Sequence, residues 1–181
     1  MGKVLYSAAM SLDGFIAGPG GDMSWMRPYL GPNPQIDELQ RDIGALLIGN
    51  RTFHGDDPNR GTEHEGAFGG TWVGPSFVVT HEIGQPPADD VTYVGDLESG
   101  LNAATAAAGD RYVALLGADV ARQCLVAGLL DEIVLTVLPV LLGDGTRLFA
   151  EPDGHQVALE QVSVTEVANG FNVWMRVVPA S

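Results

Sequence analysis

The chain has 181 residues, the length of one domain, and we treat residues 1–181 as a single domain. Its 23 acidic and 9 basic residues give a net charge of −14, which argues against binding to nucleic acid or to an anionic membrane surface. The single cysteine, Cys124, excludes an intrachain disulfide and a cysteine-rich zinc cluster. The first residues do not resemble a signal peptide, and no apolar run is long enough for a membrane helix, so we expect a soluble cytoplasmic protein.

Predicted strands and helices alternate over the first three quarters of the chain. In chain order we expect a strand at 4–10, a helix at 34–42, a strand at 45–48, a helix at 50–53, strands at 76–80 and 91–94, a helix at 97–108, a strand at 112–116, a helix at 118–127 and a strand at 133–138. Alternating segments at 157–167 and 171–178 flank an Asn-Gly pair, which is typical of a hairpin. The order predicts an α/β fold with a mostly parallel central sheet, helices on both faces and a C-terminal antiparallel hairpin.

Residues 56–74 interrupt this alternation with five glycines and mixed charge. A loop of this length in a compact domain is usually functional or disordered. We expect a mobile flap over the site, with Phe68 and Trp72 placed to touch a substrate. His54 and His64 lie near its acidic residues, but no spacing matches a known ligand set, so we expect no metal site.

Ligands bind open α/β sheets at the carboxyl ends of the strands, which here fall at 10–16, 49–53, 80–81 and 117–120. Gly49 ends one strand and a helix follows it. The N–H groups at the start of that helix, with Arg51 and Thr52, favour an anion such as phosphate. The alternative is an ordinary capped turn between strand and helix.

Other positions at or near these strand ends have two interpretations each. Gly117 allows close approach of a ligand to the backbone, whereas Asp119 is suited to cap the following helix. Thr80 and His81 either hold a phosphate or are ordinary surface residues, and Trp25 either walls a flat ligand or anchors its loop in the core. The sequence has neither a Gly-x-Ser-x-Gly elbow, typical of many hydrolases, nor the phosphate-binding loop of P-loop nucleotidases.

Four motifs follow one another along the chain. They are Ser-Leu-Asp-Gly at 11–14, Gly-Asn-Arg-Thr-Phe at 49–53, Gly-Leu-Leu-Asp-Glu at 128–132 and Pro-Val-Leu-Leu-Gly-Asp-Gly at 139–145. In this order they resemble the dihydrofolate-reductase-like superfamily, and more closely its riboflavin-biosynthesis reductase branch, the RibD C-terminal domain. The resemblance covers nearly the whole chain and implies a reductase that uses NADPH.

The resemblance also implies a role for individual residues. The residues implied to contact the cofactor are Ala9 and Ile16 at the nicotinamide, Gly49, Arg51 and Thr52 at phosphate, Thr80 and His81 at the 2′-phosphate, and Gly117, Ala118, Asp119 and Val120 at the pyrophosphate. The residues expected on the substrate side are Asp13, Trp25, Phe68 and Trp72.

Two positions depart from the superfamily pattern. Leu116 stands where a first glycine usually precedes the pyrophosphate turn, which predicts weaker binding of the cofactor. Dihydrofolate reductases carry a carboxylate near the start of the helix after the tryptophan loop, and the nearest candidate here is Asp37, which is shifted along the chain. Folate reduction is therefore not implied, and the proton donor is expected to be Asp37 or a bound water.

We therefore expect an NADPH-dependent reductase of a small heterocyclic, pterin- or pyrimidine-like substrate. The alternatives are a riboflavin-pathway 5-amino-6-ribosylaminouracil-phosphate reductase and a non-catalytic dinucleotide-binding domain. Arg51, Thr80 and His81 favour NADPH, while Glu82 is the nearby carboxylate that would suit NADH. The branch commonly forms homodimers, and the apolar segment 134–142, expected as an outer strand, also predicts a homodimer.

Overall fold

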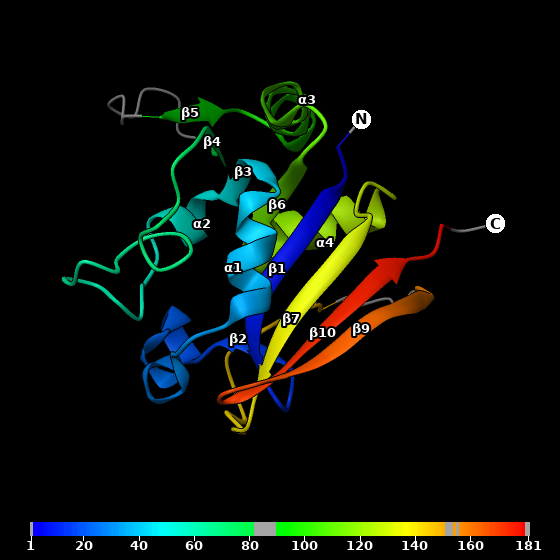
Figure 1. Ribbon diagram of the computed structural model, residues 1–181. Helices are drawn as coiled ribbons and strands as arrows, with labels where there is room; N and C mark the ends of the chain where they lie inside the picture. The colour runs from blue at the N-terminus through cyan, green and yellow to red at the C-terminus, as the bar shows by residue number, and fades with distance from the viewer. Residues whose placement is uncertain (1, 82–89, 151–153, 155, 180–181) are drawn as a thin grey trace.

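The computed structural model describes residues 2–81, 90–150, 154 and 156–179. Its main sheet has eight strands in the order β5-β4-β3-β6-β1-β7-β10-β9 (Figure 1). The strands of this sheet are β1 (Val4–Ser11), β3 (Ile43–Gly49), β4 (Ser76–Val79), β5 (Val91–Val94), β6 (Tyr112–Leu116), β7 (Glu132–Leu138), β9 (Leu159–Val167) and β10 (Gly170–Val177). The helices are α1 (Pro34–Arg41), α2 (Asn50–Phe53), α3 (Leu97–Ala108) and α4 (Ala118–Val126), with short 3₁₀ turns η1 (Pro19–Gly21) and η2 (Ser24–Tyr29).

Neighbouring strands are parallel from β5 through β7, whereas β10 runs antiparallel to β7 and β9 runs antiparallel to β10. The predicted parallel sheet and C-terminal hairpin are therefore confirmed. A small antiparallel sheet of β2 (Phe15–Ala17) and β8 (Thr146–Arg147) was not predicted, because segments of two and three residues carry no periodicity.

The expectation that segment 134–142 forms an outer strand is wrong. Its strand, β7, lies between β1 and β10, and the outer strand on this side is β9. β7 is apolar because it has neighbours on both edges and packing on both faces. The argument for a homodimer that rested on this segment therefore does not hold.

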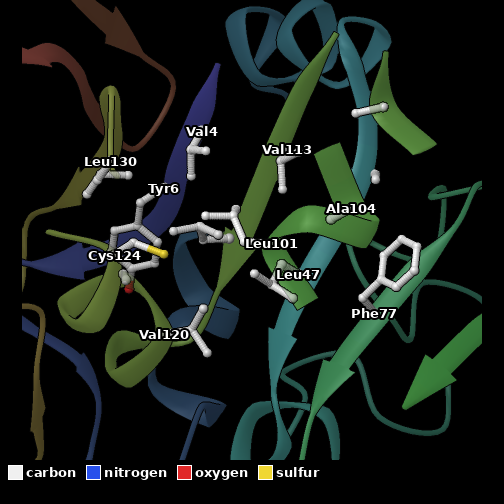
Figure 2. Close-up of a cluster of buried hydrophobic side chains, with 14 of the residues drawn as sticks. Val4, Tyr6, Leu47, Phe77, Leu101, Ala104, Val113, Val120, Cys124 and Leu130 are labelled. Atoms are coloured by element: carbon white, nitrogen blue, oxygen red, sulfur yellow. The ribbon is translucent and has the colours of Figure 1, made fainter. Parts of the chain in front are cut away.

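Alternating side chains of the strands build a separate core on each face of the sheet. Tyr6 of β1 packs in the larger core with Leu101 of α3 and Val120 of α4, and Figure 2 shows these side chains together with Cys124. Leu5 of β1 points to the opposite face. On that second face, Leu5 packs with Leu39 of α1 and Val134. A further cluster on the same face is centred on Ile43, Leu46 and Val78. Helices thus cover both faces, as predicted.

Two further findings bear on function. Among the described residues, no helix combines the length and the apolar character needed to cross a membrane. The same residues contain no group of three His, Cys, Asp or Glu side chains arranged to hold a metal ion.

Candidate functional site

The pairing between β1 and β6 stops before the carboxyl end of β1, and we call this place the gap between the two strands. The two strands pair only from Val4 to Tyr6, whereas β1 stays paired with β7 as far as Ser11. Beyond Tyr6, no strand among the described residues pairs with the edge of β1 that faces β6, so backbone N–H and C=O groups on this edge could bind a ligand. Ala9 lies on this stretch, on the α1 face by its alternation with Leu5. Ile16 packs against the core of the other face, so these two residues lie on opposite sides of the sheet.

Three of the predicted phosphate-binding residues meet beside this gap. A Cβ atom placed on Gly117 would lie 2.5 Å from Thr52 Oγ1, so only glycine allows this approach. Gly117 has a φ of 109°, which also favours glycine. A Cβ on Gly49 would lie 3.2 Å from Val120 Cγ2. The structure therefore brings the turns after β3 and β6 into contact.

Arg51 and Asp119 are exposed at the same end of the sheet, whereas Val120, also predicted to contact the cofactor, is buried in the core. Arg51 is exposed on α2. Gly117 forms the N-cap of α4, so the interpretation of Asp119 as the cap is wrong. Ala118 opens the helix, and the Asp119 carboxylate accepts hydrogen bonds from Arg122 and Gln123 one turn further on.

The strand ends of β3 and β4 are neighbours, since Gly49 pairs with Val79. Thr80 follows directly and is buried, and its N–H donates to the carbonyl of Val94 (2.9 Å). His81 is exposed. Glu82 lies outside the described residues.

Asp13 fastens the turn after β1 to the segment after β7. Its Oδ1 accepts hydrogen bonds from Ser11 Oγ (2.6 Å) and the Leu142 N–H (3.1 Å), and its Oδ2 accepts one from the Gly143 N–H (2.7 Å). The bond from Ser11, with the two backbone N–H groups, lowers the pKa of Asp13 to about 2. These contacts give the Ser-Leu-Asp-Gly motif a structural role that joins two loops at the site.

Trp25 differs from the other predicted aromatic residues. Its indole Nε1 is buried and has no hydrogen-bond partner among the described residues. Its loop is tied to residues 56–58 because the Met23 N–H donates to Asp56 Oδ2 (3.0 Å) and Arg27 Nε donates to the Pro58 carbonyl (2.7 Å). An unpaired buried donor in a loop at this end of the sheet is suited to a ligand acceptor.

Phe68 and Trp72 lie in a different environment. Both pack against the cluster of Ile43, Leu46 and Val78, and Trp72 Nε1 donates to Ser76 Oγ (3.2 Å) at the amino end of β4. Residues 54–75 contain no helix or strand, as predicted, but these two rings anchor the loop to the core. The geometry places Trp72 away from the strand ends that carry the other predicted residues.

The predicted acid, Asp37, is exposed on α1, while Ile36 and Leu39 of the same helix face the core. The helix therefore directs Asp37 toward solvent. Between α1 and the sheet lies a cluster of uncharged polar side chains, which we call the neutral cluster. Its members are Asn33, Gln35, Thr136, Ser163 and Asn172.

This cluster is absent from the sequence predictions. Asn172 is completely buried, although amides are usually exposed. One signal was present, since Asn33 directly precedes Pro34 and an asparagine before a proline is typical of a helix start.

With this geometry established, comparison with known proteins decides the family. Residues 2–173 match the family described as RibD C-terminal domain. The chain belongs to this family. The chain is also 26% identical over 156 residues to the uncharacterised protein YwjB of Bacillus subtilis strain 168, covering 82% of this chain and 83% of that one.

Solved structures show that this RibD C-terminal domain has the dihydrofolate-reductase-like fold. A Shewanella sp. PV-4 protein assigned to riboflavin biosynthesis matches with a TM-score of 0.77 and 23% identity, covering 97% of this chain and 99% of that one. A diaminohydroxyphosphoribosylaminopyrimidine deaminase/5-amino-6-(5-phosphoribosylamino)uracil reductase of Thermotoga maritima matches with a TM-score of 0.67 and 19% identity. That match covers 98% of this chain but 57% of the Thermotoga chain.

Proposed function

We propose that this RibD C-terminal domain is an NADPH-dependent reductase of a small heterocyclic substrate. The observation that carries the proposal is the open edge of β1 beyond Tyr6, directly beside the contact between Thr52 and Gly117. A flat ring can use the backbone groups of such an edge, and close backbone turns without side chains accommodate phosphate groups. The proposal rests on this fit together with family membership.

The residues present fit the cofactor. Gly49, Thr52 and the start of α4 would hold its phosphates, Arg51 its 2′-phosphate, and Ala9 its nicotinamide. When bound, NADPH supplies the hydride. The chain's own contribution is to hold the ring at the β1 edge and to orient the substrate against it.

The substrate would lie on the α1 face, next to Ala9. Trp25 supplies a buried N–H that lacks a partner among the described residues, and Thr136 is the register partner of Ala9 on β7. Since Asp37 points to solvent, we propose that water delivers the proton that the reduction requires.

The test is turnover of purified protein with NADPH and a panel of heterocycles, followed by the loss of the near-ultraviolet absorbance of NADPH. Family membership makes 5-amino-6-(5-phosphoribosylamino)uracil the first compound to include. Oxidation of NADPH that depends on one of these compounds supports a reductase. Binding of NADPH with no turnover on any member of the panel would instead support a non-catalytic dinucleotide-binding domain.

Arg51 provides the test of cofactor choice. Arg51→Ala removes a planar cation suited to phosphate oxygens, so NADPH binding should weaken by about 1.5–3 kcal/mol and NADH binding much less. Equal dissociation constants of the wild type for the two cofactors, measured by tryptophan fluorescence, would contradict the preference for NADPH.

We also propose a homodimer, now on the basis of the hairpin itself. Leu159, Val164 and Phe171 are exposed on the face of β9 and β10 opposite α1, and β9 is a long edge strand. Exposed apolar edges favour pairing between copies. Light scattering should give twice the chain mass of 19.0 kDa, and Val164→Glu should give a monomer. A wild-type mass of one chain at micromolar concentration would contradict the dimer.

A further inference from the structure

In the neutral cluster beneath α1, each hydrogen bond fixes which atom of the next side chain donates and which accepts. The series begins at the cap of α1 and ends on the face where we propose that the substrate binds. It begins at the backbone, where the Ile36 N–H donates to Asn33 Oδ1 (3.4 Å) as the cap of α1. A backbone N–H can only donate, so Oδ1 of Asn33 must point toward it. The Nδ2 amide group of Asn33 must then point toward the sheet.

The next step fixes Asn172. Asn33 Nδ2 donates to Asn172 Oδ1 (3.1 Å), and Asn172 Nδ2 donates back to Asn33 Oδ1 (2.8 Å). Asn172 Nδ2 also donates to Gln35 Oε1 (2.9 Å). Asn172 is completely buried, so no water competes for these bonds, and the reciprocal pair admits one orientation.

The last step fixes Thr136. Its Oγ1 accepts a hydrogen bond from Asn33 Nδ2 (3.2 Å) and donates its only proton to Asn172 Oδ1 (2.8 Å). A hydroxyl has one proton and two lone pairs, so one lone pair remains after both contacts. A threonine hydroxyl normally rotates to donate or accept as its neighbour requires, but this one is held as an acceptor.

Thr136 lies where a fixed acceptor could contact the proposed substrate. It is the register partner of Ala9, both side chains lie on the α1 face, and Thr136 is only partly buried. We propose that Thr136 determines specificity: its hydroxyl accepts a hydrogen bond from an N–H group of a neutral heterocycle lying against Ala9. This inference rests on the proposed function for the location of the substrate. It adds that the site prefers a substrate with a hydrogen-bond donor facing Thr136. The hydroxyl of Thr136 can only accept there, because the bonds that start at the cap of α1 use its proton.

The test uses uracil and 1,3-dimethyluracil as probes, because the second keeps the ring and both carbonyls but has no N–H. Binding to the full chain is measured by ligand-observed NMR without cofactor, for the wild type, Thr136→Val and Thr136→Ser. The wild type should prefer uracil by about three- to tenfold, the size of one neutral hydrogen bond. Thr136→Val, which keeps the side-chain shape, should abolish the preference, and Thr136→Ser should retain it.

Thr92→Val, at an exposed threonine on β5, is the matched control and should bind as the wild type does. A preference caused only by the bulk of the methyl groups would survive in Thr136→Val, and that result would overturn the assignment. Equal binding of the two probes by the wild type, or binding of neither, would overturn it as well. NADPH titration of the same samples separates the two proposals, because the proposed reductase fails if NADPH does not bind, whatever the probes show.

Discussion

Two polar clusters, each around one buried side chain, occupy the same face of β7 and β10, and their chemistry differs. At the amino end of β7, the buried Glu132 carboxylate accepts hydrogen bonds from Lys3 Nζ (2.6 Å), Tyr112 Oη (3.0 Å) and Trp174 Nε1 (2.8 Å). At the carboxyl end lies the neutral cluster around Asn172. The register pairs Glu132 with Arg176 and Thr136 with Asn172, so the two clusters lie four residues apart along each strand.

The difference shows that β7 and β10 satisfy a buried charge at one end and hold a helix with neutral groups at the other. A buried carboxylate is tolerated only when donors satisfy it, and Glu132 has three, one of them from Lys3, the only lysine of the chain. It ties the first strand to β7 at the end away from the proposed site. Near that site, amides and hydroxyls hold α1 in place without adding charge. We therefore expect the cluster around Glu132 to respond to pH and the cluster around Asn172 not to.

Removal of Glu132 should give the largest loss of stability. Glu132→Ala leaves the indole of Trp174 and the hydroxyl of Tyr112 without their acceptor, so the free energy of unfolding should fall by about 3 kcal/mol. Urea unfolding measures this. Glu160→Ala is the matched control, since its ion pair with Arg176 is largely exposed and should contribute less than about 1 kcal/mol. Equal losses in the two variants would show that Glu132 has no special role.

Asn172 should come second. Asn172→Leu removes both the acceptor of Thr136 and the donor to Gln35, and these groups stay partly buried, so we expect a loss of about 2 kcal/mol. Gln161→Leu, at an exposed amide on β9, should change stability by less than about 0.5 kcal/mol. If Asn172→Leu were as stable as this control, the neutral cluster would contribute nothing to the fold.

The sequence predicts the local elements of this structure well, but it does not predict the long-range contacts of the neutral cluster. The helix at 97–108 and the strands at 91–94 and 112–116 were predicted to the residue, because periodicity and turn residues are local signals. Gly49, Thr52 and Gly117 were placed together because parallel strands end on one edge. Asn172 was missed, since its partners Asn33 and Gln35 are more than 130 positions away in sequence. Asp37 was predicted from its position in the chain, but the rotation of α1 directs it to solvent.

The effect of pH should be smaller than either substitution, because protonation leaves the Glu132 side chain in place. Burial opposes ionisation of Glu132, but the hydrogen bonds from Lys3, Trp174 and Tyr112 outweigh it and lower its pKa below the ordinary 4.5. A lowered pKa in the folded state contributes stability above the unfolded value, and this contribution is lost as pH falls through the folded value. The stability difference between wild type and Glu132→Gln should therefore be constant near neutral pH and shrink below pH 4.5.

Asn172→Leu provides the contrast in the same experiment. No member of its cluster titrates, so its difference from the wild type should stay constant over the same pH range. Urea unfolding at a series of pH values measures both differences. A pH-dependent loss in Asn172→Leu, or a constant one in Glu132→Gln, would contradict the division into a charged and a neutral cluster.

The smallest effect concerns a polar atom that belongs to neither cluster. Tyr6 is almost fully buried in the core on the other face, with its ring edge-on to Phe149 (5.9 Å between centroids), and its hydroxyl has no partner among the described residues. Burial of an unpaired hydroxyl costs about 1–3 kcal/mol. Tyr6→Phe keeps the ring and removes this cost, so it should stabilise the protein by about 1 kcal/mol and raise Tm by about 2–4 °C.

Tyr112→Phe is the matched control for this last prediction, because its hydroxyl donates to Glu132. The same chemical change should there lower stability by about 1.5 kcal/mol, since it removes a hydrogen bond to a charged group. Thermal unfolding of the two variants beside the wild type should give shifts of opposite sign. Destabilisation by both substitutions would mean that the Tyr6 hydroxyl has a partner, such as a buried water, and that burial of a polar group in this core is compensated as fully as in the two clusters.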